Sequence, residues 1–273
     1  MRIRAGFTIA FECPGPAPML LMLSVHPSRR SDLEVADDLR SDPALPMTRY
    51  RDGFGNICHR LLAPAGPLTL ASDFVIRDTG LPDRRAPGAA QTPVEELPDG
   101  AVVFLLGSRY CETELLSDAA WSLFERFEPG WPRAQAIVDW VHDNITFGYP
   151  HARKTRTAFE TFQEKVGVCR DFAHLAVAFC RCMNIPARYC SGYLGDIGVP
   201  PVGPMDFSAW FEAWLDGSWY AFDPRNHQPR IGRILMARGR DATDTAIATT
   251  FGPADLVRFE VVTDELSETS SGA

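Results

Sequence analysis

The spacing of hydrophobic residues changes period near residue 100. Before that point, short runs of alternating apolar and polar residues are separated by turn-forming clusters such as Pro14-Gly15-Pro16. Such alternation predicts antiparallel strands with one buried face. Residues 80–100 are rich in proline, glycine and charge, which is typical of a connection. We therefore expect a β-rich region over residues 1–100 that ends in this connection.

Beyond residue 100 the apolar positions recur every three or four residues, as on one face of a helix. This pattern predicts helices over 116–127, 137–145 and 172–183, and strands over 187–194, 207–215, 218–222 and 256–262. The two halves together indicate the α+β class, with a core over 101–265. The small and polar residues 266–273 are expected to form a flexible tail.

Composition narrows the function classes. The chain has 273 residues and a formal net charge of -8, which argues against nonspecific nucleic-acid binding and against docking on an anionic membrane. Its N-terminus alternates like a strand and has no signal-peptide core, and no apolar run approaches the ~20 residues that span a bilayer. Seven cysteines without a regular framework fit a reducing compartment. We expect a cytoplasmic protein.

Cys169 is the candidate nucleophile. It follows Gly167-Val168 and immediately precedes the third predicted helix, where backbone N–H groups and the helix dipole favour a thiolate. Its neighbours Arg170 and Asp171 act in opposite directions on the thiol. A buried structural cysteine is the competing interpretation. Cys180-Arg181-Cys182 is a bare Cys-x-Cys without a second pair, so no zinc site is expected.

A hairpin supplies the second group of candidates. Asp216-Gly217 is a strong two-residue turn signal between the runs 207–215 and 218–222. If Leu215 pairs with Ser218, Asp223 faces Trp210, and Ser208 is its diagonal neighbour on the same face. A base and the group that orients it need such proximity. The alternative is a polar hairpin face in which Asp223 caps the turn at Pro224.

Three blocks in order resemble the bacterial transglutaminase-like cysteine protease family. They are Gly167-Val168-Cys169-Arg170-Asp171-Phe172-Ala173-His174-Leu175, then Asn184-Ile185-Pro186-Ala187-Arg188-Tyr189, then Asp206-Phe207-Ser208-Ala209-Trp210 with Trp219-Tyr220-Ala221-Phe222-Asp223-Pro224. The β-rich region with Tyr50-Arg51-Asp52-Gly53 also resembles the N-terminal part of that family. The resemblance implies a papain-like core in which a cysteine attacks a carbonyl, a histidine is the base and an aspartate orients it.

Residue by residue, the resemblance assigns the nucleophile to Cys169 and the orienting carboxylate to Asp223. Ser208 stands where the family carries its histidine. A serine cannot act as general base at neutral pH. His227, four residues after Asp223, is the first choice for a substitute base, and His151 is a second possibility in a loop before Cys169.

Other residues receive weaker assignments. His174 lies five residues after Cys169, about 140° around the helix, and should point away from the thiol. Gln163 has the spacing of an oxyanion-hole glutamine in papain-like enzymes, although a surface position on a helix is the alternative.

Two hypotheses follow. The first is a cysteine-dependent enzyme that hydrolyses or transamidates an amide of a peptide or protein substrate. The second is an inactive transglutaminase-like module that binds a peptide or protein in the same cleft, with aromatic walls from Trp210, Trp214, Trp219 and Tyr193. Neither needs a cofactor, and no metal motif is present. A partly exposed thiol of low pKa favours the enzyme, whereas a buried inert thiol favours the binding module.

Overall fold

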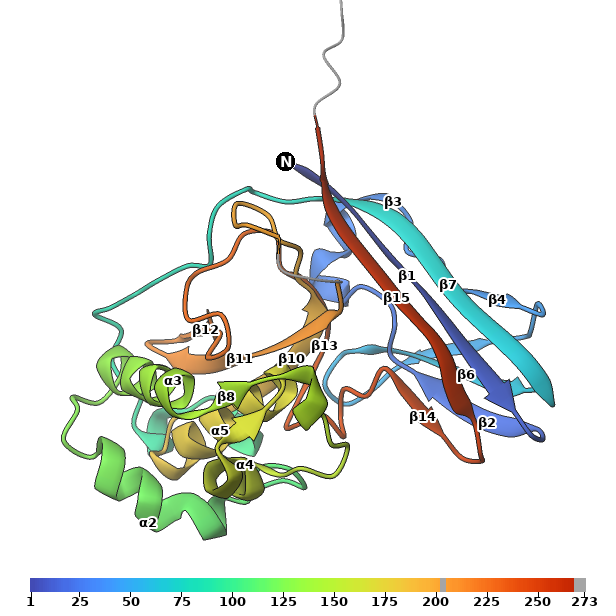
Figure 1. The fold of residues 1–273 in the computed structure, drawn as a ribbon. Helices are drawn as coiled ribbons and strands as arrows, with labels where there is room; N and C mark the ends of the chain where they lie inside the picture. The colour runs from blue at the N-terminus through green and yellow to red at the C-terminus, as the bar shows by residue number, and fades with distance from the viewer. Residues whose placement is uncertain (202–204, 268–273) are drawn as a thin grey trace, which may run out of the picture.

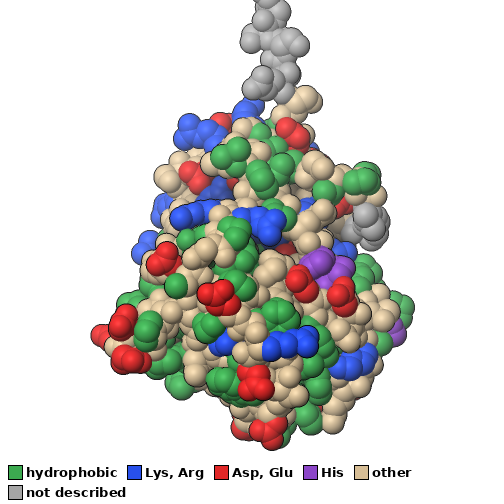
Figure 2. Space-filling view, turned by 90° about the vertical axis from the view of Figure 1, so that its left-hand side faces the viewer, with side chains coloured by type: hydrophobic (Ala, Val, Ile, Leu, Met, Phe, Trp, Pro, Cys, Tyr) green, Lys and Arg blue, Asp and Glu red, His purple; other side chains and the backbone are tan. Residues whose placement is uncertain are grey.

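The computed structural model describes residues 1–201 and 205–267 (Figure 1). It has a β-rich part beside a part in which helices pack on a sheet, as the sequence predicts for the α+β class. On one face of the molecule, acidic and basic side chains are interspersed among apolar ones (Figure 2). In the described ranges, no helix is long and apolar enough to cross a membrane.

The β-rich part contains two sheets. The five-stranded sheet has the order β15-β1-β7-β3, with β4 also paired to β7, and the four-stranded sheet has the order β14-β2-β6-β5. The strands are β1 (Arg2–Cys13), β2 (Ala17–Leu21), β3 (Leu33–Val35), β4 (Arg40–Asp42), β5 (Thr48–Arg51), β6 (Ile57–Ala63), β7 (Gly66–Arg77), β14 (Ala248–Thr250) and β15 (Asp255–Leu266). Alternate side chains of β1 and β7 are buried in a common apolar core, which explains the period of two in the sequence.

The last two strands differ from the expected layout, which assigned all of residues 101–265 to the core. Strand β15 pairs with β1 along nearly its whole length, from Arg2 opposite Leu266 to Glu12 opposite Asp255, and β14 pairs with β2. These two C-terminal strands cover edges of β1 and β2 that would otherwise be unpaired. The β-rich part is therefore built from both ends of the chain. The expected tail 266–273 lies outside the described residues from 268 on.

The second part has a four-stranded antiparallel sheet in the order β12-β11-β10-β13, covered by helices. Its strands are β10 (Ala187–Tyr193), β11 (Phe207–Leu215), β12 (Ser218–Phe222) and β13 (Ile234–Gly239), and β8 (Thr146–Phe147) pairs with β9 (Val166–Gly167) nearby. The helices are α1 (Asp99–Val102), α2 (Thr113–Phe124), α3 (Trp131–Asn144), α4 (Ala158–Glu164) and α5 (Cys169–Cys182). Short 3₁₀ turns occur at Pro27–Asp32, Val94–Glu96, Val103–Leu105 and Tyr149–His151. Helix α5 is buried on nearly all sides between α2, α3, α4 and the sheet.

Among the elements missed from the sequence, α4 and β13 matter most for the site. Helix α4 has only seven residues, too few for a clear apolar period, but its start carries a capping box. The Thr157 side chain accepts a hydrogen bond from the backbone of Glu160, and the Glu160 carboxylate accepts one from the backbone of Thr157. Strand β13 follows a loop rich in arginine, and the charged residues around it obscured its short apolar run in the sequence. Both lie next to the site described below.

The proline-rich connection is anchored to the core. The Asp83 carboxylate bonds to Arg233 and to the backbone N–H of Arg230, and the carbonyl groups of Ala89 and Ala90 accept from the backbone of Trp131 and Asp216. A segment without regular structure thus reaches the polar groups behind the hairpin β11–β12.

Candidate active-site cleft

Cys169 is the first residue of α5, as the sequence predicts. The chain enters the helix from β9, and Gly167 is required just before it, because a Cβ atom there would lie 2.7 Å from the Cβ of Asp171. The Asp171 carboxylate turns back and accepts a hydrogen bond from the Val168 N–H at 3.0 Å, which satisfies one of the free donors at the helix start.

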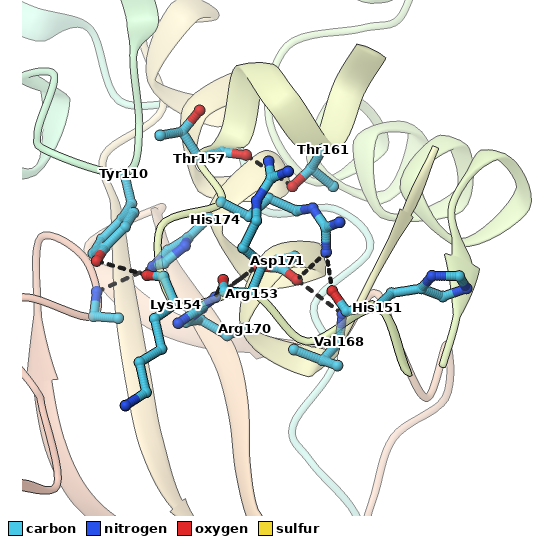
Figure 3. A network of polar contacts seen from close by, with 12 residues as sticks. Tyr110, His151, Arg153, Lys154, Thr157, Thr161, Val168, Arg170, Asp171 and His174 are labelled. Carbon is cyan, nitrogen blue, oxygen red and sulfur yellow. Dashed lines mark hydrogen bonds and ion pairs between the residues drawn. The ribbon is translucent and has the colours of Figure 1, made fainter. Parts of the chain in front are cut away.

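A buried ion-pair network holds this turn in place (Figure 3). Asp171 is fully buried and lies 3.4 Å from the guanidinium of Arg156, which is also buried and contacts Glu164 at 2.8 Å. Arg156 also donates to the carbonyl oxygen of His151, so the loop before α4 is tied to the start of α5. Arg170 pairs with the other oxygen of Asp171 at 3.2 Å. The position of Cys169 is thus fixed by groups on three elements.

Cys169 lies between two cavities. One has a volume of about 260 Å³ and the other about 550 Å³, and Cys169, Asp206, Phe207 and Ser208 line both. Cys169 is partly exposed, whereas the other six cysteines are buried. The two cavities together form a cleft of the size that small ligands and peptide segments occupy. We call the first the Arg225 side and the second the Arg109 side, after residues in their walls.

The environment disfavours the thiolate. Burial of the sulfur raises the pKa of Cys169 to about 11, and the carboxylates of Asp206 and Asp223 contribute in the same direction. The Ala209 backbone N–H and the Arg225 guanidinium lower the pKa, but they do not compensate. Burial likewise raises the pKa of Asp206. The expected benefit of the helix start is therefore outweighed by desolvation and two nearby carboxylates.

The hairpin has the predicted register, with Leu215 opposite Ser218 and Phe211 opposite Phe222. Asp223 follows β12 directly and is buried. Its carboxylate lies 2.9 Å from Arg233 and accepts from the backbone and the side chain of Asn226 at 2.9 and 2.7 Å. Burial opposes ionisation, but Arg233 and Asn226 hold the pKa of Asp223 below its usual value. Both carboxylate oxygens are therefore occupied by groups other than an imidazole.

His227 is not placed to serve as the substitute base. Its Nε2 lies 2.8 Å from Asp139 on α3, and its ring stacks on His142 with centroids 4.2 Å apart. The backbone of His227 is left-handed, with φ of 56°, so the chain turns its exposed side chain toward α3 and not toward Cys169. It lines a small separate cavity together with Asp223. The expected bend at Pro224 exists but directs the imidazole elsewhere.

The other histidines near Cys169 are also engaged away from the thiol. His174 is fully buried on α5, stacks on Tyr110 with centroids 5.1 Å apart and accepts from the Ala242 N–H at 3.0 Å. Burial lowers the pKa of His174 to about 3, so its ring is neutral. It points away from the thiol, in agreement with its helical spacing. Figure 3 shows the His151 ring directed away from the network. Among the described residues, no histidine lines either cavity.

Three residues expected to bind substrate lie elsewhere. Trp210 and Tyr193 are buried, and Tyr193 packs against Phe74 in the core shared with the β-rich part. The faces of β10 and β11 that carry these two side chains are covered by other elements. The alternation of apolar and polar residues alone did not show this. Gln163 is exposed on α4 and lines neither cavity, which agrees with the surface alternative. Trp214 and Trp219, the other expected wall residues, pack against each other and also line neither cavity.

The cleft is instead lined by residues that sequence reasoning did not single out. Its aromatic walls are Phe147, Tyr149 and Phe207 on the Arg225 side and Tyr110 and Tyr189 on the Arg109 side. Asp206, at the junction, stands two residues before Ser208 in the block that carries the resemblance, so its place in that block was the available signal. Tyr110 and Arg109 come from a loop far from Cys169 in sequence, and only the fold brings them together. The described residues contain no cluster of His, Cys, Asp and Glu suited to a metal ion.

Comparison with known proteins agrees with this geometry. The family model for the transglutaminase-like superfamily matches residues 124–224, which run from the end of α2 past Cys169 to the residue after Asp223. The chain is 26% identical over 257 residues to an uncharacterized protein of Mycobacterium leprae, covering 90% of each. It is 28% identical over 232 residues to an uncharacterized protein of Mycobacterium tuberculosis, covering 77% of this chain and 74% of that one.

One solved structure matches both parts of the molecule. It is named as a putative cysteine protease from Cytophaga hutchinsonii, has a TM-score of 0.85 and 28% sequence identity, and covers 98% of this chain and 91% of its own. The order of cysteine helix, sheet and hairpin, the family match and this structural likeness agree that residues 124–224 form a transglutaminase-like core.

Proposed function

We propose that this protein binds a peptide segment in the cleft around Cys169 and does not process it by a Cys-His-Asp route. In this proposal Ser208 occupies the position of the base histidine. One observation carries the proposal: the described part of the chain places no imidazole in the wall of either cavity. A thiol with a pKa of about 11 then has no partner to accept its proton near neutral pH.

The state of Asp223 supports the same conclusion. In a nucleophile-base-orienter site the aspartate holds the imidazole. Here the Asp223 carboxylate is committed to Arg233 and Asn226, and Arg233 is in turn bonded to Asp83. These contacts support a structural role for Asp223, which stabilises the loop behind the hairpin. The cleft itself is retained, with aromatic walls and a partly exposed floor, and such a cleft suits an extended peptide.

A cysteine-dependent acyl-transfer enzyme is the second candidate, favoured by one feature of Cys169. It is the most accessible of the seven cysteines, and it stands at a helix start beside the N–H of Ala209. In that reaction the sulfur would bond to the carbonyl carbon, and the amine would leave with a proton. Water or another amine would then release the acyl group from the thioester. The thiol proton would need an acceptor, and Asp206 is the titratable group in both walls.

Binding and turnover can be separated in one set of measurements. The purified full chain is used to select peptides from a randomised linear library, and the selected peptides are incubated with it at pH 7.5. Hydrolysis and incorporation of a fluorescent primary amine are followed by mass spectrometry. We expect retained peptides and no turnover above that of the Cys169→Ala variant.

Turnover that disappears in Cys169→Ala would overturn the binding-module proposal and establish the enzyme. Failure of the wild-type chain to retain any peptide would also overturn it. Arg126→Gln is the control for the effect of a surface substitution and should retain peptides like the wild type. Arg126 is exposed, lies outside the cleft and forms no ion pair within the described ranges.

A further inference from the structure

The two sides of the cleft differ in charge. On the Arg225 side, Arg225 and Arg230 share the wall with the carboxylates of Asp196 and Asp206, and Arg230 lies 3.4 Å from Asp196. Positive and negative groups are therefore balanced there. This side gives a bound peptide no strong preference for either sign.

The Arg109 side carries an excess of positive charge. Arg109, Lys154 and Arg170 line it, and Asp206, at the junction of the two cavities, is its one carboxylate among the described residues. Arg170 is compensated by Asp171 at 3.2 Å. Arg109 and Lys154 are exposed, and neither forms an ion pair within residues 1–201 and 205–267. The Tyr110 side chain and, more weakly, the Asp241 carboxylate raise the pKa of Arg109, but neither forms an ion pair with it. Two cations without an ion-pair partner thus stand at one cavity of a chain of net charge -8.

These cations stand on a fixed platform. The Tyr110 hydroxyl donates to the Lys154 carbonyl at 2.9 Å, and the Tyr110 N–H donates to Asp241 at 2.9 Å. The Tyr110 ring stacks on the buried His174, and the Arg109 guanidinium lies 5.3 Å from the centre of the same ring. Figure 3 shows the Lys154 side chain extending away from the network while its backbone is held by Tyr110. The mouth of the cavity is thus preorganised, which limits the entropy lost on binding.

Hydroxyl groups complete this wall. Thr243, Thr245, Thr249 and Ser191 all line the cavity. Ser191 and Thr245 are 6% and 3% exposed, and their hydroxyl oxygens have no hydrogen-bond partner among the described residues. Buried polar groups are normally paired, so this wall has unused hydrogen-bonding capacity. Apolar residues from the same segment as these threonines, Ala242, Ala246, Ile247 and Ala248, also line the cavity.

We propose that the Arg109 side of the cleft binds an acidic side chain of the peptide, with Arg109 and Lys154 as the specificity-determining cations. This rests on the proposed function, because it assigns a substrate class to the same cleft. A carboxylate suits a mouth with two unpaired cations, whereas a basic side chain would meet them as like charges. The volume of the cavity, about 550 Å³, leaves room for the neighbouring residues of the peptide.

The test compares peptides selected from one randomised linear library by three forms of the full chain. They are the wild type, the Arg109→Gln/Lys154→Gln double variant, and the Arg126→Gln control. We expect wild type and control to enrich Asp and Glu at one position, and the double variant to lose that enrichment. For a wild-type-selected peptide, replacing the enriched Glu by Gln should weaken binding about 3- to 10-fold at low salt and less at high salt.

A charge-reversal variant sharpens the test. Arg109→Glu/Lys154→Glu should enrich Lys and Arg at the same position, an outcome that loss of folding cannot produce. If the wild type retains peptides without acidic enrichment, or if the double variant keeps that enrichment, the assignment to Arg109 and Lys154 is wrong while peptide binding stands. If no form retains peptides, the proposed function fails and this inference fails with it.

Discussion

The cleft has a half formed at the start of helix α5, the helix half, and a half formed at the hairpin β11–β12, the hairpin half. The two halves differ in what their polar groups contact. The helix half places Cys169 at the start of α5 and fixes it with Asp171, Arg156 and Gly167. The hairpin half also has its predicted register, but its polar groups pair with one another. Asp223 pairs with Arg233, which also pairs with Asp83 from the connection.

Under the proposed function, the cleft keeps the position of the cysteine but has no base beside it. A nucleophile at a helix start needs only a short turn and a cap. A base and its orienter need two side chains from separate strands, and replacement of one of them leaves a buried carboxylate without its partner. Such a carboxylate must be compensated, and here Arg233 does so.

The largest expected effect comes from breaking the hairpin-half ion pairs. Arg233→Leu leaves Asp83 and Asp223 without their shared cation, and removal of one partner from a buried pair costs about 3–5 kcal/mol. We expect the free energy of unfolding in urea to fall by that amount. Arg258→Gln breaks an ion pair between two exposed side chains and should cost no more than about 1 kcal/mol. Equal losses in both variants would contradict a structural role for the Arg233 pairs.

The reactivity of Cys169 tests the helix half. Because its pKa is about 11, the thiolate fraction near neutral pH is far below that of an ordinary cysteine. Alkylation by iodoacetamide at pH 7.5 should be about 10- to 100-fold slower than for an unfolded cysteine peptide and should rise steeply above pH 9. Mass-spectrometric mapping should still find Cys169 modified before the six buried cysteines. Fast labelling at neutral pH would show that the thiol is activated after all.

Adding an imidazole at position 208 tests the role that the proposed function gives to Ser208. Ser208→His adds an imidazole to the wall that Cys169 and Ser208 share, and an ion pair between them lowers the thiol pKa. We expect alkylation of Cys169 at pH 7.5 to rise about 10-fold, less than in a complete triad, because Asp223 remains bound to Arg233. Ser208→Asn is the matched variant of similar polarity without a titrating ring. An equal increase in Ser208→Asn would point to changed access and not to an ion pair.

The two halves should also lose stability in different pH windows. His174 in the helix half has a pKa of about 3 when folded against 6.5 for an ordinary histidine, so the unfolded chain binds its proton first as the pH falls. Its contribution is present above pH 6.5 and declines between pH 6.5 and 3. The pKa of Asp223 is lowered from its ordinary value of 3.8. Its contribution to the free energy of unfolding is therefore present above pH 3.8 and is lost only as the pH falls below that value.

The measurement is the free energy of unfolding at pH 7 and pH 5. The free energy of unfolding of the wild type should fall between pH 7 and pH 5. We expect this fall to be about 1–2 kcal/mol smaller in His174→Gln. His26, whose pKa burial lowers to about 4, and His59, whose pKa is also lowered, account for part of the remainder. An identical slope in wild type and His174→Gln would refute the assignment.

Local patterns in the sequence determined much of the architecture. The periods of two and near 3.6 identified β1, β10, β11, β12, α2, α3 and α5, because each of these elements buries one face or stripe. The Asp216-Gly217 turn set the register of the hairpin, from Leu215 opposite Ser218 to Phe211 opposite Phe222, since a two-residue hairpin leaves one pairing. Helix α5 begins at Cys169, three residues before Phe172, where the apolar period that predicted the helix starts.

Only the tertiary structure decided which side chains meet. The pairing of β15 with β1, the bond of His227 to Asp139 and the bridge from Asp83 through Arg233 to Asp223 all join residues distant in sequence. Short-range patterns do not specify such contacts, because they depend on how separate elements pack. The pKa of Cys169 belongs to the same class: position at a helix start favours the thiolate, but burial and the carboxylate of Asp206, contributed by another segment, outweigh it.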